Sequence, residues 1–302
     1  MAFAAPPPPG PPAHRRARAS ARLVERWSWA MGQPVHLVLY ADSDDRGYEA
    51  AAGALAELRR VESRLTLFES ASDLVELNRH AGGRAMRVDT DLAAVLAASA
   101  EARFATAGAF NVAVDPLMRT WGFHRPRATA PAPAEIAEAR EAVEAAVVVL
   151  DGDRVALPAR HTQLDLGGVG VGYGLDRMAA VLRQQGVTSA FIDISGDCLG
   201  LGSPPGKAGW DVAIADPLVP DGTRGMVRLR DRALATSANT VSVVRYGREV
   251  RGHVMDPASG YPADRKVQAT AVARSGLLAD SRSTAMLVMG KPAPGVERAI
   301  FV

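Results

Sequence analysis

Two oxygen-bearing residues, Asp280 and Thr284, stand four positions apart in a stretch whose apolar spacing predicts a helix over 276–289. Residues four apart share one face of a helix, so the carboxylate and the hydroxyl would point the same way. Such a pair on a mostly buried helix suits Mg2+, which takes few protein oxygens and completes its shell with phosphate and water. Taken alone, the pair fits a structural role better, with Asp280 capping or pairing and Thr284 bonding back to a carbonyl.

A glycine-rich stretch, LDLGGVGVGYG at 164–174, comes just before a predicted helix over 173–185. An apolar run ending at Asp165 predicts a strand before the loop, and 190–194 predicts another after the helix. Glycines let the backbone come close to a ligand, and a helix N-terminus offers free N–H groups to an anion, so a phosphate-bearing ligand is one interpretation. The spacing matches neither G-x-G-x-x-G nor a P-loop, and tight packing also explains such a turn.

A third candidate stretch is GHVMDPASGYP at 252–262, where Asp-Pro and Ser-Gly indicate a tight turn. His253 and Asp256 in this turn are our candidates for a general base. The remaining histidines are scattered, and we expect surface or packing roles for all of them, namely His14, His36, His80, His124 and His161.

Composition limits the function classes. The chain has 302 residues, 48% of them apolar and 23% charged, as in an ordinary globular protein. A net charge of +2 does not indicate a nucleic-acid partner, and no apolar run approaches the roughly 20 residues of a membrane helix. Cys198 is the only cysteine, which excludes a disulfide framework and favours a small buried residue.

The N-terminal 26 residues are rich in Ala, Pro and Arg and lack the apolar core of a signal peptide. We therefore expect a disordered leader over 1–26, one domain over 27–302, and a cytoplasmic location. Strands and helices do not alternate regularly, which favours an α+β fold. The further predicted elements are helices over 47–65, 91–106 and 135–145, a short helix after Ser72, a hairpin of 147–150 with 155–157, and strands at 35–41, 210–215, 226–229, 241–246 and 268–273.

The segment 108–123 is predicted to be irregular, either as a functional loop or as a buried Trp/Phe plug. With this segment, an ordered set of motifs between residues 28 and 290 resembles the ApbE-type FAD:protein FMN transferases. The motifs are Met31-Gly32, Leu77-Asn78 at the end of a helix, GAFNVAVDPLMRTWGF at 108–123, LDLGGVGVGYGLDR at 164–177, SGD at 195–197, ATSANT at 235–240, GHVMDPASGYP at 252–262, and ADSRSTAMLVMG at 279–290.

The resemblance implies an α+β fold related to the T-fold, with a mixed or antiparallel sheet and packed helices. It implies an enzyme that binds FAD with Mg2+, releases AMP, and transfers FMN to a Thr or Ser hydroxyl of an acceptor flavoprotein. Matched position by position, Asp280 and Thr284 would be side-chain Mg2+ ligands, with a backbone carbonyl near Gly168 as the third. Positions implied to contact FAD are Met31, Phe68, Ala109, Phe110, Asn111, Asp165, Val171 and Met255.

Two of these positions depart from the family pattern. Val171 stands where the family loop commonly has Lys, and Asn111 where Asp is common. Three hypotheses therefore stay open. The first is an FMN transferase, the second an FAD pyrophosphatase that yields free FMN and AMP, and the third a flavin-binding protein without catalysis.

Overall fold

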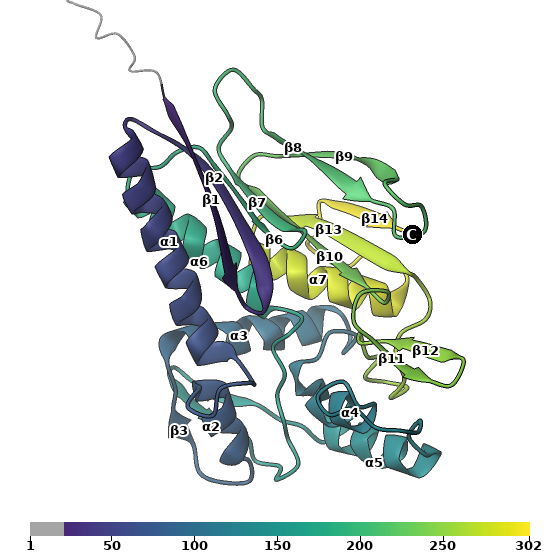
Figure 1. Ribbon diagram of the computed structural model, residues 1–302. Coiled ribbons are helices and arrows are strands. Elements are labelled where there is room, and N and C mark those ends of the chain that lie inside the picture. The colour runs from purple at the N-terminus through teal and green to yellow at the C-terminus, as the bar shows by residue number, and fades with distance from the viewer. Residues whose placement is uncertain (1–20) are drawn as a thin grey trace, which may run out of the picture.

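A seven-stranded antiparallel sheet forms the centre of the fold in the computed structural model, which describes residues 21–302 (Figure 1). Each neighbouring pair of strands in it is antiparallel, in agreement with the predicted α+β class. From edge to edge the strands are β1 (Arg22–Ala30), β2 (Gln33–Ala41), β6 (Ala190–Ile194), β7 (Asp197–Leu201), β10 (Arg232–Ala238), β13 (Gln268–Ala273) and β14 (Arg298–Phe301).

The sheet is covered on both faces because side chains alternate along its central strands. In β10, Ala233 and Ala235 belong to the core shared with the helices, while Leu234 packs on the opposite face. Cys198 also lies on that opposite face and is buried, as expected. The helices of the first face are α1 (Asp44–Leu65), α6 (Gly170–Gln184) and α7 (Gly276–Met289), and the opposite face is covered by the hairpin of β8 (Trp210–Ala215) and β9 (Thr223–Leu229).

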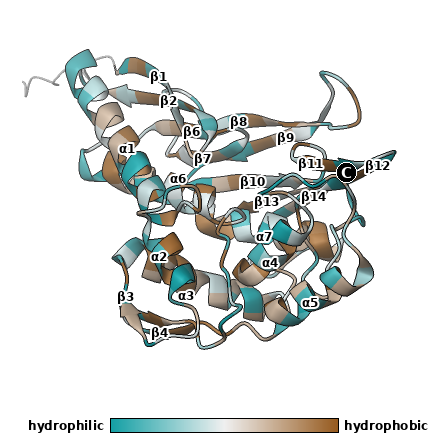
Figure 2. Cartoon of the chain, turned by 60° about the horizontal axis from the view of Figure 1, so that its bottom comes forward, coloured by the Kyte–Doolittle hydropathy of each residue, from teal (hydrophilic) through white to brown (hydrophobic). Residues whose placement is uncertain are grey.

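A further layer of short elements lies beyond these helices, on the side away from the sheet (Figure 2). Most of its apolar side chains join the far end of α1 in a second core, while those of the two helices within 115–144 form a cluster of their own. The elements are α2 (Asp73–Arg79), α3 (Thr90–Ala105), a 3-10 turn η1 (Val112–Val114), α4 (Asp115–Thr120), α5 (Pro133–Glu144), and a small sheet of β3 (Met86–Arg87), β5 (Arg154–Ala156) and β4 (Val149–Asp151). A separate hairpin of β11 (Val243–Tyr246) and β12 (Glu249–Gly252) precedes β13 in the chain.

The structure differs from several predictions of local structure. Order was expected from Trp27, but strand β1 already begins at Arg22. The earlier start follows from the pairing of Arg22–Ala30 along its whole length with β2. Residues 1–20 of the predicted leader lie outside the described residues. Helix α6 begins at Gly170, three residues before the predicted start. The predicted irregular segment contains α4, and its Trp121 is a buried plug whose indole N–H donates to Gly260 O at 2.9 Å.

The run that ends at Asp165 was predicted to be a strand and is not one. Its backbone is held by a side chain, since the Asn78 amide accepts from Leu164 N at 2.8 Å and donates to Leu164 O at 2.9 Å. Asn78 thereby fixes the entry to the glycine loop without a neighbouring strand. Within residues 21–302 we find no helix with the length and apolarity needed to cross a membrane.

Candidate functional site

The three predicted metal ligands lie together in one cavity of about 500 Å³, here called the central cavity. Asp280 and Thr284 face it from α7, and Gly168 faces it from the glycine loop. The Asp280 carboxylate accepts a hydrogen bond from Gly172 N at 2.9 Å, so it is held by the first turn of α6. A Cβ on Gly168 would lie 3.0 Å from Thr284 Oγ1, which shows that the loop backbone packs directly against that hydroxyl.

A second carboxylate, Asp197 at the start of β7, shares the central cavity with Asp280. Burial raises the pKa of Asp280, and burial together with the nearby Asp280 charge raises the pKa of Asp197 well above its usual value. Each carboxylate has one oxygen in a backbone hydrogen bond, from Gly172 N and from Thr236 N respectively, at 2.9 Å. The other oxygen of each is available for a cation.

An all-oxygen donor set of this kind fits Mg2+, which prefers carboxylate, hydroxyl and carbonyl ligands. Asp280, Thr284 and the Gly168 backbone supply those ligand types, and Asp197 adds a second negative charge. Two carboxylates in a poorly solvated site repel each other unless a cation lies between them. Ser237 keeps the Thr284 hydroxyl in place, since its Oγ lies 3.1 Å from Thr284 Oγ1.

Glycine at the α6 start is required by packing between the helices. A Cβ on Gly172 would lie 2.2 Å from Gly276 O and 2.7 Å from the Asp280 Cβ, which no side chain could tolerate without backbone movement. Gly170 differs, because a Cβ there would have no atom within 4 Å. Part of the glycine-rich pattern therefore brings α6 and α7 together, which places Asp280 beside the loop.

An outer cavity of about 390 Å³ adjoins the central one and shares Asp165 and Val171 with it. Met31 and Phe68 line this outer cavity. Phe68 is 84% exposed, so its ring is free to stack on a planar ligand. The remaining predicted FAD contacts line the central cavity, and these are Ala109, Phe110, Asn111 and Met255.

His253 also lines the central cavity, and its chemistry suits a proton acceptor. Burial lowers the pKa of His253, so the imidazole is neutral at neutral pH. Its Nδ1 is buried and has no hydrogen-bond partner among residues 21–302. A neutral imidazole can accept a proton from a hydroxyl in the same cavity through a ring nitrogen that faces it.

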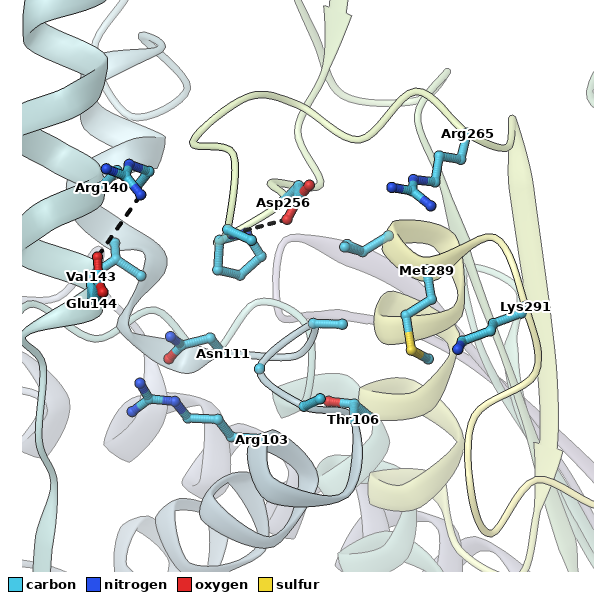
Figure 3. A pocket seen from close by; sticks show the side chains of 16 residues that line it. Arg103, Thr106, Asn111, Arg140, Val143, Glu144, Asp256, Arg265, Met289 and Lys291 are labelled. Carbon is cyan, nitrogen blue, oxygen red and sulfur yellow. Dashed lines mark hydrogen bonds and ion pairs between the residues drawn. The ribbon is translucent and has the colours of Figure 1, made fainter.

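Asp256 does not join His253 in that cavity. Its carboxylate accepts from Ala258 N at 2.9 Å and from Ser259 Oγ at 3.0 Å, so it caps its own turn. It lines a separate pocket of about 610 Å³, here called the basic pocket, which also contains Arg103, Arg140, Arg265 and Lys291 (Figure 3). The geometry thus separates the two predicted proton acceptors.

His124, expected to be a surface or packing residue, lies half-buried in a cluster of charged side chains. Its Nε2 donates to Asp165 Oδ2 at 3.1 Å and lies 3.1 Å from Asp115 Oδ1, in the wall of the outer cavity. The Asp115 and Asp165 carboxylates raise the pKa of His124 to about 9, so the ring is a cation at neutral pH. The three side chains are also spaced as metal ligands would be, but a ring that carries this proton cannot coordinate an ion.

Sequence patterns gave no signal for His124, because its partner Asp165 lies 41 residues away and its neighbours are Phe123 and Arg125. Asp197 did have a signal. It directly follows the predicted strand 190–194 in a Ser-Gly-Asp turn, a place where a side chain can face a site at the end of a sheet.

Known proteins share both the sequence pattern and the fold of this chain. The model of the ApbE family matches residues 31–297. The chain belongs to the ApbE family. A FAD:protein FMN transferase of Treponema pallidum is 29% identical over 94% of this chain and 86% of its own length. Another of Klebsiella pneumoniae is 28% identical over 86% of this chain and 80% of its own.

Solved ApbE structures share the fold. The ApbE protein of Thermotoga maritima superposes with a TM-score of 0.82 at 26% identity, covering 89% of this chain and 87% of that one. The flavin transferase ApbE of Vibrio cholerae gives 0.76 at 26% identity, covering 89% and 88%. The ApbE match contains every predicted site residue from Met31 to Thr284, together with Asp197 and His124.

Proposed function

We propose that this ApbE protein transfers FMN from FAD to a Thr or Ser hydroxyl of an acceptor protein and releases AMP, with Mg2+ as the required cation. The observation that carries the proposal is the convergence of Asp197, Asp280 and Thr284 on the Gly168 backbone, in a cavity that continues into one lined by Phe68. A cation site beside an aromatic wall suits a flavin joined to a pyrophosphate.

Asp280, Thr284 and the Gly168 carbonyl would hold Mg2+, and Asp197 would add charge to the same site. When bound, Mg2+ would neutralise the negative charge that develops on the pyrophosphate as its bond breaks. The backbone of the glycine loop would position the phosphates, because no side chain stands between it and the cavity at Gly167 and Gly168.

The acceptor hydroxyl oxygen would attack the FMN phosphorus, and the bond from that phosphorus to the bridging oxygen would break. His253 would take the hydroxyl proton, and AMP would leave with the bridging oxygen. The lowered pKa of His253 and its position in the lining of the central cavity support this role, whereas the carboxylate of Asp256 is occupied within its own turn. We therefore assign the general base to His253 alone.

The test is an assay of mass and AMP. The protein is incubated with FAD and Mg2+, with and without an acceptor domain of a known flavinylated protein that contains the target Thr. We expect AMP together with an acceptor heavier by one FMN. AMP with free FMN and an unlabelled acceptor would instead support the pyrophosphatase, and bound FAD without AMP would support a flavin-binding protein.

Two variants locate the chemistry. His253→Gln should lower the rate of transfer while FAD binding, followed by flavin fluorescence, stays near the wild-type value. Asp256→Asn should keep the kcat of transfer at saturating acceptor, since that residue lies outside the central cavity. Equal loss in both variants would contradict the assignment of the base.

A further inference from the structure

The basic pocket lies next to the central cavity and is separate from the outer one. It shares Ala109, Asn111 and Pro257 with the central cavity and no residue with the outer cavity. A chain segment in the basic pocket would therefore lie beside the site proposed for the phosphates. The two cavities assigned to FAD leave this third space, of about 610 Å³, without a ligand.

The lining of the basic pocket carries an excess of positive charge. Four of its residues are cations, and two, Glu144 and Asp256, are carboxylates. In Figure 3, Arg103 and Arg140 lie on one side of the pocket, and Arg265 and Lys291 lie on the other.

The two sides differ in whether these cations have ion-pair or hydrogen-bond partners within the protein. Arg140 lies 3.9 Å from Glu144, and Arg103 donates to Ala146 O at 3.1 Å. Arg265 and Lys291 are exposed and make no ion pair or hydrogen bond with any residue in the described range 21–302. Asp256 forms no ion pair with either of them, and both of its oxygens accept bonds within its own turn.

The proposed reaction needs a third participant besides FAD and the cation, namely the acceptor hydroxyl. That hydroxyl has to arrive from a side that FAD does not fill, and the basic pocket borders the central cavity at Asn111 and Pro257. Unpaired cations at the mouth of a site attract and orient oppositely charged segments.

We propose that the basic pocket is the docking site for the acceptor and that Arg265 and Lys291 select acceptor segments with Asp or Glu near the target Thr or Ser. This inference rests on the proposed transferase function. It identifies the partner by its chemistry, as an acidic segment that carries a hydroxyl.

The experiment uses charge reversal on both partners. The enzyme is made as wild type, as the double variant Arg265→Glu/Lys291→Glu, and as Arg230→Glu, an exposed control position that lines none of the three cavities. The probe is an acceptor domain that wild type labels, made with its native residues and with the acidic residues beside the target Thr changed to Lys.

The expected result is a rise of roughly tenfold in the KM of the double variant for the native acceptor, with an unchanged Kd for FAD. The Lys-substituted acceptor should be labelled poorly by wild type and better by the double variant. Arg230→Glu should behave as wild type with both acceptors.

Three outcomes would overturn the inference. Normal KM values of the double variant for the acceptor would exclude the docking role of the basic pocket and leave the proposed transferase function intact. A parallel loss of FAD affinity would assign the basic pocket to the nucleotide instead. If wild type labelled no acceptor while releasing AMP, the proposed transferase function would fail, and this inference with it.

Discussion

The inner and outer ends of the candidate site each contain two carboxylates, but only the outer end has a cation supplied by the chain. At the inner end, neither Asp197 nor Asp280 forms an ion pair with a Lys, Arg or His of the described chain. At the outer end, His124 Nε2 lies 3.1 Å from both Asp115 and Asp165, and Arg119 also contacts Asp115 at 2.5 Å.

This difference separates a structural charge cluster from a site that requires a ligand. The outer cluster is neutralised within the fold, so it stabilises the wall of the outer cavity whether or not a ligand is bound. The two inner carboxylates repel each other and destabilise the fold until a cation binds between them. This is the usual state of a metal site before the metal binds. Each prediction below alters one end and leaves the other as a reference.

The largest effect is expected from Asp280→Asn at the inner end. Loss of the charged ligand should lower the rate of AMP release on the order of 1000-fold, because the cation contributes several kcal/mol to phosphoryl transfer. The metal-free variant should be at least as stable as wild type, since the repulsion with Asp197 is removed. Mg2+ should no longer raise its Tm in a thermal melt.

Asp176→Asn is the matched control for that substitution. Asp176 lies on α6 and accepts hydrogen bonds from Gly276 N at 2.7 Å and Leu277 N at 2.9 Å, so it caps α7 outside the cavities. This variant should lower the Tm and keep its response to Mg2+. A metal-free Asp280→Asn protein that is clearly less stable than wild type would argue that Asp280 is structural.

The second prediction tests the outer end through pH. The folded pKa of His124, about 9, lies above the ordinary value of 6.5, so its stabilising charge is fully present below pH 6.5 and is lost as pH rises through 9. Wild type should exceed His124→Gln in unfolding free energy by up to about 3 kcal/mol near pH 6.5, and this margin should shrink toward pH 10. Urea unfolding at several pH values measures it, and a margin that is constant with pH would contradict the charge cluster.

Sequence patterns were informative where one helix or one turn carries the chemistry. Asp280 and Thr284 share a face of α7, as their spacing predicts, and the family resemblance then pointed to a shared metal role. Patterns failed where distant segments meet, as in the group of Asp115, His124 and Asp165, which comes from three separate places in the chain. Asn78 shows the same limit, because it replaces a strand partner for Leu164 across 86 residues.

The third prediction concerns two glycines, Gly170 and Gly172, in the first turn of α6. Gly172→Ala should cost about 1–3 kcal/mol of stability, because its Cβ would meet Gly276 O at 2.2 Å and push α7 away. Gly170→Ala should be neutral or slightly stabilising, since nothing lies within 4 Å of its Cβ. Denaturant unfolding of both variants measures their free energies of unfolding and tests this difference. Equal stability of the two would show that packing does not require Gly172, which would favour a role in ligand contact.

The smallest effect is expected from Phe68→Ala in the outer cavity. Phe68 is 84% exposed, so its removal should leave the Tm unchanged and weaken FAD binding by about 1 kcal/mol through the loss of ring stacking. Phe104→Ala is the control, because Phe104 is 91% exposed on α3 and lines neither the central nor the outer cavity. Fluorescence titration with FAD compares them. If both variants bind FAD as wild type does, the outer cavity does not hold the ring, and the flavin would have to lie wholly within the central cavity beside the metal site.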